Sequence, residues 1–125
     1  MTTFHAVVWM DHSQAHVLMF DKEHVEAQRV KARSHHTPKH GHVGADKDFF
    51  KQVADALAGV NEVLLTGPAN AKIEFRDFCK HNAHAVDKAI VDVVSSDHPT
   101  DAQLVAMARQ YFLKYDQTAA DPTQL

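Results

Sequence analysis

The start of the chain contains two short apolar stretches, residues 4–10 and 15–20, separated only by Asp11, His12 and Ser13. Each stretch has the length of a β-strand and is rich in Val, Met and Phe, so the two are predicted to pair as a hairpin. A second polar turn at residues 21–23 is followed by residues 25–32, which alternate imperfectly between apolar and polar, as an edge strand does. This opening therefore predicts a meander of three strands.

The rest of the chain alternates between helix and strand signals. Apolar residues at helical spacing begin after Ala45 and stop before Gly59, a favourable residue for a helix C-terminus. The segments that follow are a strand at residues 62–66, a helix around residues 71–79, a strand at residues 85–94, and a last helix with an apolar face at residues 104–112, capped by Asp97 or Thr100. The predicted order of elements is βββαβαβα.

This order favours a single α/β domain over residues 1–115, built on a mixed five-stranded sheet. Parallel strands need crossover connections that contain a helix, so helices are expected on both faces of the sheet. The ribonuclease H-like architecture has this order of elements. Residues 116–125, which include Asp116, Asp121 and Pro122, are expected to form a flexible tail.

The composition is that of an ordinary soluble protein, with 45% hydrophobic and 23% charged residues among 125. No apolar run approaches the roughly 18 residues of a membrane-spanning helix, and the first residues do not resemble a signal peptide. We therefore expect a cytoplasmic protein without a membrane partner. The one cysteine, Cys79, has no second cysteine with which to form an intramolecular disulfide, and it is expected to be a small packed side chain.

Positive charge is concentrated in residues 29–42 (RVKARSHHTPKHGH), although the formal net charge of the chain is −3. This stretch contains no Asp or Glu, and residues 34–44 are expected to form an exposed loop. Arg and Lys neutralise phosphates, and imidazoles gain charge below about pH 6.5 and stack on bases, so RNA or another anionic partner is predicted to dock here. The candidate binding residues are Arg29, Lys31, Arg33, His35, His36, Lys39, His40 and His42.

Two alternatives remain open for this part of the chain. The imidazoles of His35, His36, His40 and His42 could hold a transition metal such as zinc, but their spacing matches no recognised site and the loop has no paired Cys or carboxylate. No cofactor is therefore expected, and a His-loop metal-binding protein is the alternative function. The other alternative is a protein–protein adaptor that forms a homodimer through its third strand.

A smaller anion site is indicated where a strand ends and a helix begins at Gly67 and Pro68. Backbone N–H groups at a helix start can hold a phosphate, and Gly67 and Lys72 are the candidate residues. A plain turn without a ligand is the favoured interpretation of the two.

No catalytic arrangement is predicted. Hydrolytic enzymes of ribonuclease H-like architecture hold two metal ions with a carboxylate cluster, but here only Asp11 lies where such an acid is needed. Asp46, Asp48 and Asp101 stand at helix starts, where carboxylates serve as caps. Asp11 itself is expected to form a turn by accepting backbone N–H groups near Ser13. No serine has the setting of a nucleophile elbow, so a non-enzyme is expected.

Two segments resemble a known family, namely AVVWMDHSQAHVLMF (residues 6–20) and LLTGPANAKIEFRDF (residues 64–78), and PKHGHVG (residues 38–44) lies where that family carries its exposed loop. They are similar to the middle domain of archaeal and eukaryotic class-1 release factors and of pelota, and to small bacterial proteins labelled translational machinery proteins. The resemblance implies a ribonuclease H-like fold and a partner that is the ribosome, structured RNA or tRNA.

The loop is where the sequence departs from that family. In release factors the loop resembles a Lys-His-Gly run that leads into Gly-Gly-Gln, the tripeptide that helps water attack peptidyl-tRNA. Here residues 39–44 read KHGHVG, and the chain contains no Gly-Gly-Gln. The resemblance therefore implies a non-catalytic ribosome- or RNA-associated module related to translation.

Overall fold

The computed structural model describes residues 5–32 and 47–120, without the side chains of residues 115–120. Its elements follow the order βββαβααβα. They are β1 (His5–Met10), β2 (Gln14–Phe20), β3 (Val25–Lys31), α1 (Lys47–Ala56), β4 (Glu62–Gly67), α2 (Ala71–Asn82), α3 (His84–Ala89), β5 (Ile90–Ser95) and α4 (Asp101–Ala120).

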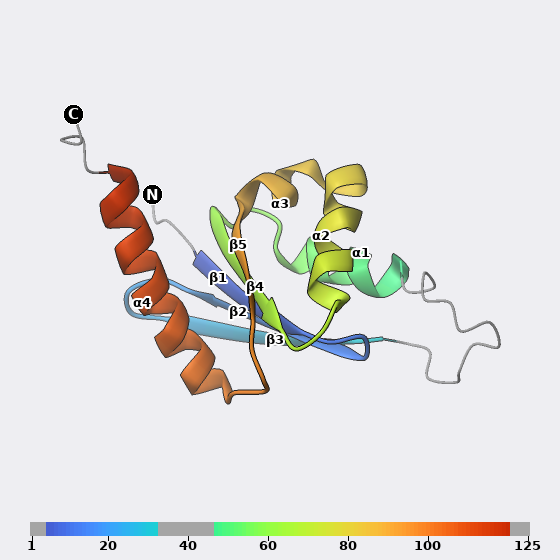
Figure 1. Cartoon of the computed structure of the whole chain (residues 1–125), viewed down its shortest axis with the longest axis horizontal. Coiled ribbons are helices and arrows are strands. Elements are labelled where there is room, and N and C mark those ends of the chain that lie inside the picture. Colours follow the sequence, from blue (N-terminus) through green and yellow to red (C-terminus); the bar gives the residue numbers. More distant parts are fainter. Residues whose placement is uncertain (1–4, 33–46, 121–125) are drawn as a thin grey trace.

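The five strands form one mixed sheet in the order β3-β2-β1-β4-β5. The pairs β1–β2 and β2–β3 are antiparallel, whereas β1–β4 and β4–β5 are parallel. Helices α1, α2 and α3 pack on one face of the sheet, and α4 lies alone on the other (Figure 1). The predicted fold class, a mixed five-stranded sheet with helices on both faces, is confirmed.

The core consists of two apolar layers, one on each face of the sheet. Strand β1 contributes to both, because successive side chains point to opposite faces. Ala6, Val8 and Met10 join the layer under α1, α2 and α3, while Val7 and Trp9 join the layer under α4. This double burial explains why β1 is a continuous apolar run, as expected of a central strand.

Asp side chains hold the two tight turns of the meander. Oδ1 of Asp11 accepts hydrogen bonds from the backbone N–H groups of Ser13 and Gln14, at 2.8 and 2.9 Å. Oδ1 of Asp21 accepts the N–H groups of Glu23 and His24 in the same way. The two bonds to Asp21, with that from His24 the larger influence, lower the pKa of its carboxyl group. The predicted role of Asp11 as a turn former is therefore confirmed.

The predicted strand at residues 85–94 is wrong in its first half. Residues 84–89 form the short helix α3, and the strand begins only at Ile90. Val86 and Ala89 are three positions apart, so one helical turn brings both into the core. Val86 and Ile90 are separated by charged residues, which suggested an exposed strand. A segment this short fits the two-residue period of a strand as well as the 3.6-residue period of a helix.

Helix α4 begins with a reciprocal cap. The backbone N–H of Gln103 donates to Oγ1 of Thr100 at 3.1 Å, and the N–H of Thr100 donates to Oε1 of Gln103 at 2.9 Å. Of the two predicted caps, Thr100 is therefore the one used. The helix continues to Ala120, past the predicted domain end at residue 115. Within the described residues, no helix is both long and apolar enough to cross a membrane.

Strand β3 is an edge of the sheet and is largely uncovered on the α4 face. It is exposed along most of its length, with only Val30 buried, and the side chain of Val25 is 45% exposed. Helix α4 lies against β1 and β2 instead. The side chains that β3 directs to the α4 face are therefore available to a partner.

Candidate functional site

Two of the eight predicted RNA-binding residues lie in the described part of the chain. Arg29 and Lys31 are both on β3. The other six, Arg33, His35, His36, Lys39, His40 and His42, fall outside the described residues, as does the whole predicted loop at residues 34–44. The candidate site is therefore built here from β3 and the side chains around it.

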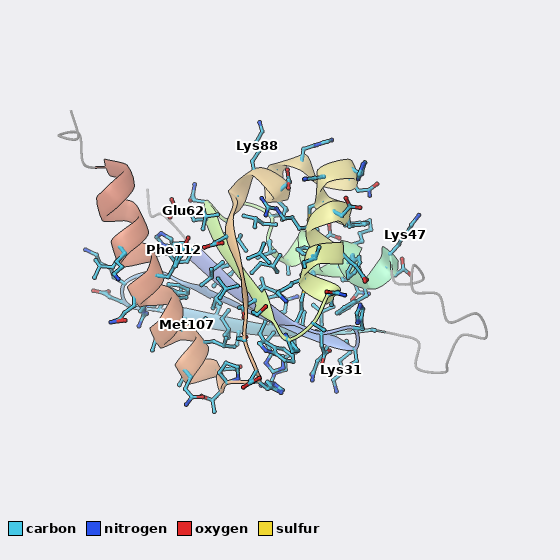
Figure 2. The ribbon with its side chains drawn as sticks, in the orientation of Figure 1. Lys31, Lys47, Glu62, Lys88, Met107 and Phe112 are labelled. Carbon is cyan, nitrogen blue, oxygen red and sulfur yellow. The ribbon has the colours of Figure 1, made fainter. Side chains whose placement is uncertain are left out.

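Arg29 and Lys31 share the α4 face of the sheet. In the β2–β3 register Arg29 stands opposite His16 and Lys31 opposite Gln14, and His16 contacts the α4-side residue Trp9. Nη2 of Arg29 lies 3.3 Å from Oδ2 of Asp101, yet the Arg29 side chain remains 57% exposed. The charge of Arg29 is thus partly balanced by Asp101, whereas Lys31 extends from the edge of the sheet (Figure 2).

His16 is a buried histidine for which the sequence predicts no role. Only 7% of its surface is exposed. Its Nδ1 lies 3.2 Å from Oδ1 of Asp101, and its Nε2 lies 3.4 Å from Oε1 of Gln14. The signal that could have identified it is the alternation of β2, which puts His16 on the same face as the buried Leu18 and Phe20.

Trp9 contacts two histidines and the connection that follows β5. Its indole N–H donates to the backbone carbonyl of Asp97 at 2.5 Å. The ring of His98 stacks on the indole, with centroids 4.0 Å apart and planes 9° apart, and the ring of His16 lies 5.6 Å away at a tilt. Trp9 is confirmed as a core residue, being 2% exposed, but its contacts with the two histidines were not predicted.

These contacts fix the connection between β5 and α4, residues 96–100, against the ends of β4 and β1. The hydroxyl groups of Thr66 and Ser96 lie 2.5 Å apart, and the N–H of Ser96 donates to the carbonyl of Gly67 at 3.0 Å. We call the five side chains at this end of the α4 face the crossover cluster. Its members are Trp9, His16, Arg29, His98 and Asp101.

No nucleophile lies next to a base among the five side chains of the crossover cluster. Its carboxylate, Asp101, is occupied by His16 and Arg29. Among the residues that the structure describes, no three His, Cys, Asp or Glu side chains come together to hold a metal ion. What the cluster offers is an aromatic surface on His98 beside the positive charges of β3.

The candidate phosphate turn has a different geometry. Gly67 has a φ of 150°, and a Cβ atom there would lie 2.1 Å from the carbonyl oxygen of Met10, so the position needs glycine. Lys72 is buried, with 3% of its surface exposed, and its ammonium group donates to the carbonyl of Ala69 in the same turn. The lysine thus ties the turn to α2. Phosphate binding at this turn stays a prediction.

No family model matches the sequence, and no curated protein matches it. Solved structures of the same fold do match. Pelota from Archaeoglobus fulgidus is 18% identical over 88% of this chain, with a TM-score of 0.65. The archaeal translation termination factor aRF1 is 17% identical over 96% of the chain, with a TM-score of 0.59.

A third match is Dom34 from S. cerevisiae, which is 13% identical over 82% of the chain, with a TM-score of 0.55. Dom34 is described as a translation termination-like factor that is involved in RNA quality control pathways and interacts with Hbs1. This chain spans 32% of pelota, 42% of aRF1 and 31% of Dom34, which is less than half the length of each. The fold is that of the ribonuclease H-like middle domain of release factors and pelota.

Proposed function

We propose that this chain is a translation-related module that binds the ribosome or structured RNA and does not catalyse a reaction. The observation that carries the proposal is the fold, which matches part of pelota, aRF1 and Dom34. The second of these is a translation termination factor, and the third is a termination-like factor involved in RNA quality control. The resemblance of residues 6–20 and 64–78 to the same family supports the proposal from the sequence.

The charges of β3 support an anionic partner. Arg29 and Lys31 are exposed, lie on one face of an edge strand, and begin the acid-free stretch of residues 29–42. Because the chain as a whole has a formal charge of −3, attraction to phosphates has to come from a local patch rather than from the net charge. We therefore propose that RNA binds at this patch, of which Arg29 and Lys31 are the described members.

The absence of catalysis is proposed on chemical grounds. The sequence lacks Gly-Gly-Gln. Oδ1 of Asp11 accepts three hydrogen bonds within its own turn, from two backbone N–H groups and the Ser13 hydroxyl. Asp101 is engaged by His16 and Arg29. Carboxylates held in this way do not form the open cluster that a two-metal mechanism needs.

The test is whether the tagged protein sediments with ribosomal particles from cell extract, and how that association depends on salt. Changing Arg29, Lys31, Arg33 and Lys39 together to Ala should weaken the association and reduce its salt dependence by about one unit of log–log slope for each lost phosphate contact. A protein that stays at the top of the gradient at low salt would contradict the proposal.

A control variant with the same change in charge removes Lys51, Arg76, Lys80 and Lys88. These four residues are exposed on α1, α2 and α3, on the face of the sheet opposite α4. Lys88 lies at the top of the view in Figure 2 and Lys31 at the bottom. If the control loses as much binding as the β3 variant, the effect is one of net charge and the proposed site is wrong.

A homodimer through β3 is the second candidate, and the free edge of this strand favours it. The backbone N–H of Asp21 donates to the carbonyl of His24, and that of Ala32 to the carbonyl of Ser13. The even-numbered residues of β3 therefore direct their backbone N–H and C=O groups toward β2. The odd-numbered ones, from Val25 to Lys31, then direct their N–H and C=O groups outward. Ala27→Pro should remove an outward donor and dissociate such a dimer, as measured by light scattering, without disturbing the β2 ladder.

A further inference from the structure

We propose that His98 is a stacking platform for an unpaired base of RNA bound by this chain. The proposal rests on the proposed function and adds to it the place where a base is held. None of the sequence motifs pointed to His98. Its significance comes from the structure, because the connection between β5 and α4 brings it onto Trp9, 89 positions earlier in the sequence.

The ring of His98 stacks on Trp9 and meets the ring of His16 edge-on at 5.6 Å, yet the residue remains exposed. The indole of Trp9 lies parallel to it at 4.0 Å and covers one ring face. His98 is nevertheless an exposed residue, while Trp9 beneath it is 2% exposed. The exposed His98 therefore extends the aromatic core of the protein to its surface, and a base that stacked on the ring face away from Trp9 would add a third ring to this stack.

The platform is held in place before any ligand arrives. On its N-terminal side, the Asp97 carbonyl accepts the Trp9 indole N–H, and Ser96 is bonded to both Thr66 and Gly67. On its C-terminal side, Pro99 restricts the backbone, and Thr100 is fixed by its reciprocal cap with Gln103. A ring that is already ordered loses little conformational entropy on binding, so stacking on it is favourable.

The charges near His98 indicate where the phosphates of a bound RNA would lie. Arg29 and Lys31 lie on the same face, two strands away from Trp9, which is about 10 Å at the usual spacing of strands. The Asp97 side chain is exposed and repels phosphate, whereas the charge of Asp101 is balanced by Arg29. The phosphates are therefore expected over β3, with one base turned onto His98.

The experiment measures binding of a fluorescein-labelled single-stranded hexanucleotide, oligo(A), to the full chain by anisotropy at low salt. His98→Ala should weaken binding by about 5- to 150-fold, the range that corresponds to the loss of one stacked base. His98→Phe should retain most of the affinity, because it keeps the aromatic face and removes only the imidazole nitrogens. His81→Ala changes an exposed histidine of α2 and should have no effect.

Trp9 supplies an independent readout, since it is the only tryptophan in the chain. Its fluorescence should change saturably with the same oligonucleotide, and a GC-rich duplex long enough to stay paired at low salt should cause a weaker change because its bases are already stacked. Equal loss of binding in His98→Ala and His98→Phe would overturn the platform, as would a wild-type protein that does not bind the hexanucleotide. Thermal unfolding of each variant checks that the fold is retained.

The two proposals fail in different ways. If His98→Ala binds the hexanucleotide as well as the wild type but the β3 variant leaves the ribosomal particles, the platform is wrong and the proposed function stands. If the wild type does not sediment with ribosomal particles and does not bind RNA, both proposals are wrong.

Discussion

Of the two glycines that the structure describes, Gly67 is the one at which an added methyl group should be more damaging. A Cβ atom at this position would lie 2.1 Å from the backbone carbonyl oxygen of Met10, and neither backbone can move without separating β1 from β4. Gly67→Ala is therefore expected to lower the free energy of unfolding by about 2–4 kcal/mol. Urea unfolding followed by circular dichroism measures this.

Gly59 is the matched control for that change. It also has a positive φ, 86°, but a methyl group added there would meet no atom of the described residues within 4 Å, its chain neighbours aside. Gly59→Ala should therefore cost only the conformational strain, about 1–2 kcal/mol. Equal costs at the two glycines would mean that the contact with Met10 is not tight in solution.

Cys79 is buried, as its sequence predicts, and its reactivity should be correspondingly low. Burial, with a smaller contribution from the nearby Asp87 carboxylate, raises the pKa of its thiol to about 12. The folded protein should therefore react slowly with iodoacetamide at pH 8, and the protein unfolded in urea should react fast. Rapid labelling of the folded chain at a rate that urea does not change would contradict this expectation.

The same raised pKa has a consequence for stability at high pH. The folded state keeps the thiol neutral, so its contribution is fully present below the ordinary thiol pKa of 9.0 and is lost as the pH rises toward about 12. The difference in unfolding free energy between the wild type and Cys79→Ala should therefore shrink over that interval. A difference that stays constant with pH would show that Cys79 does not titrate in this way.

Among single residues, burial could be predicted from the sequence, but contacts between distant residues could not. The spacing of apolar residues along β1, α1 and α2 identified Trp9, Phe49 and Phe75 as core residues. The stack of His98 on Trp9 joins residues on two elements far apart in the chain, and no local pattern carries that information. His98 looked like one more scattered histidine for this reason.

At the scale of elements, the reciprocal cap of α4 gives the clearest prediction. Thr100→Ala removes the hydroxyl that accepts the Gln103 N–H and should lower stability by about 1 kcal/mol, which differential scanning calorimetry measures as a lower Tm. Thr100→Ser retains the hydroxyl and should stay close to the wild type. An unchanged Tm in Thr100→Ala would show that Asp97, the other predicted cap, can take over.

Most elements could be predicted because their apolar periods are long enough to be unambiguous. The first two strands and helix α1 follow this rule, and the alternation of the meander gave the edge position of β3. Helix α3 was not predicted because its six residues hold only two buried side chains, Val86 and Ala89, and its packing against α2 decides its conformation. Propensity is weaker than tertiary contact in so short a segment.

For the whole molecule we expect binding without turnover. Incubation with ribosomes that carry peptidyl-tRNA, and separately with RNA and Mg²⁺ or Mn²⁺, should give no product above background, because the chain lacks Gly-Gly-Gln and its carboxylates Asp11 and Asp101 are engaged in structural contacts. A hydrolytic rate that Asp11→Asn abolishes would contradict this. It would indicate a metal-dependent hydrolase instead.

The candidate site could be predicted only in part. The concentration of Arg and Lys in residues 29–42 made Arg29 and Lys31 candidates, because charge is visible in a sequence without knowledge of the fold, and their binding of RNA stays a prediction. The acidic partner of Arg29 could not be found in this way, since Asp101 is 72 positions away and approaches β3 only through the start of α4. Such contacts depend on topology, which a one-dimensional pattern does not contain.

The arrangement of α4 also affects how the chain is made. This helix is the last element that the structure describes, yet it covers β1 and β2, which are the first, and the indole N–H of Trp9 donates to the carbonyl of Asp97, 88 positions later. A growing chain therefore exposes Val7, Leu18 and Phe20 as a bare apolar surface until α4 has left the exit tunnel. A message broken before the codons of α4 would yield a sheet with one open face, which is prone to aggregation and needs a chaperone or a protease.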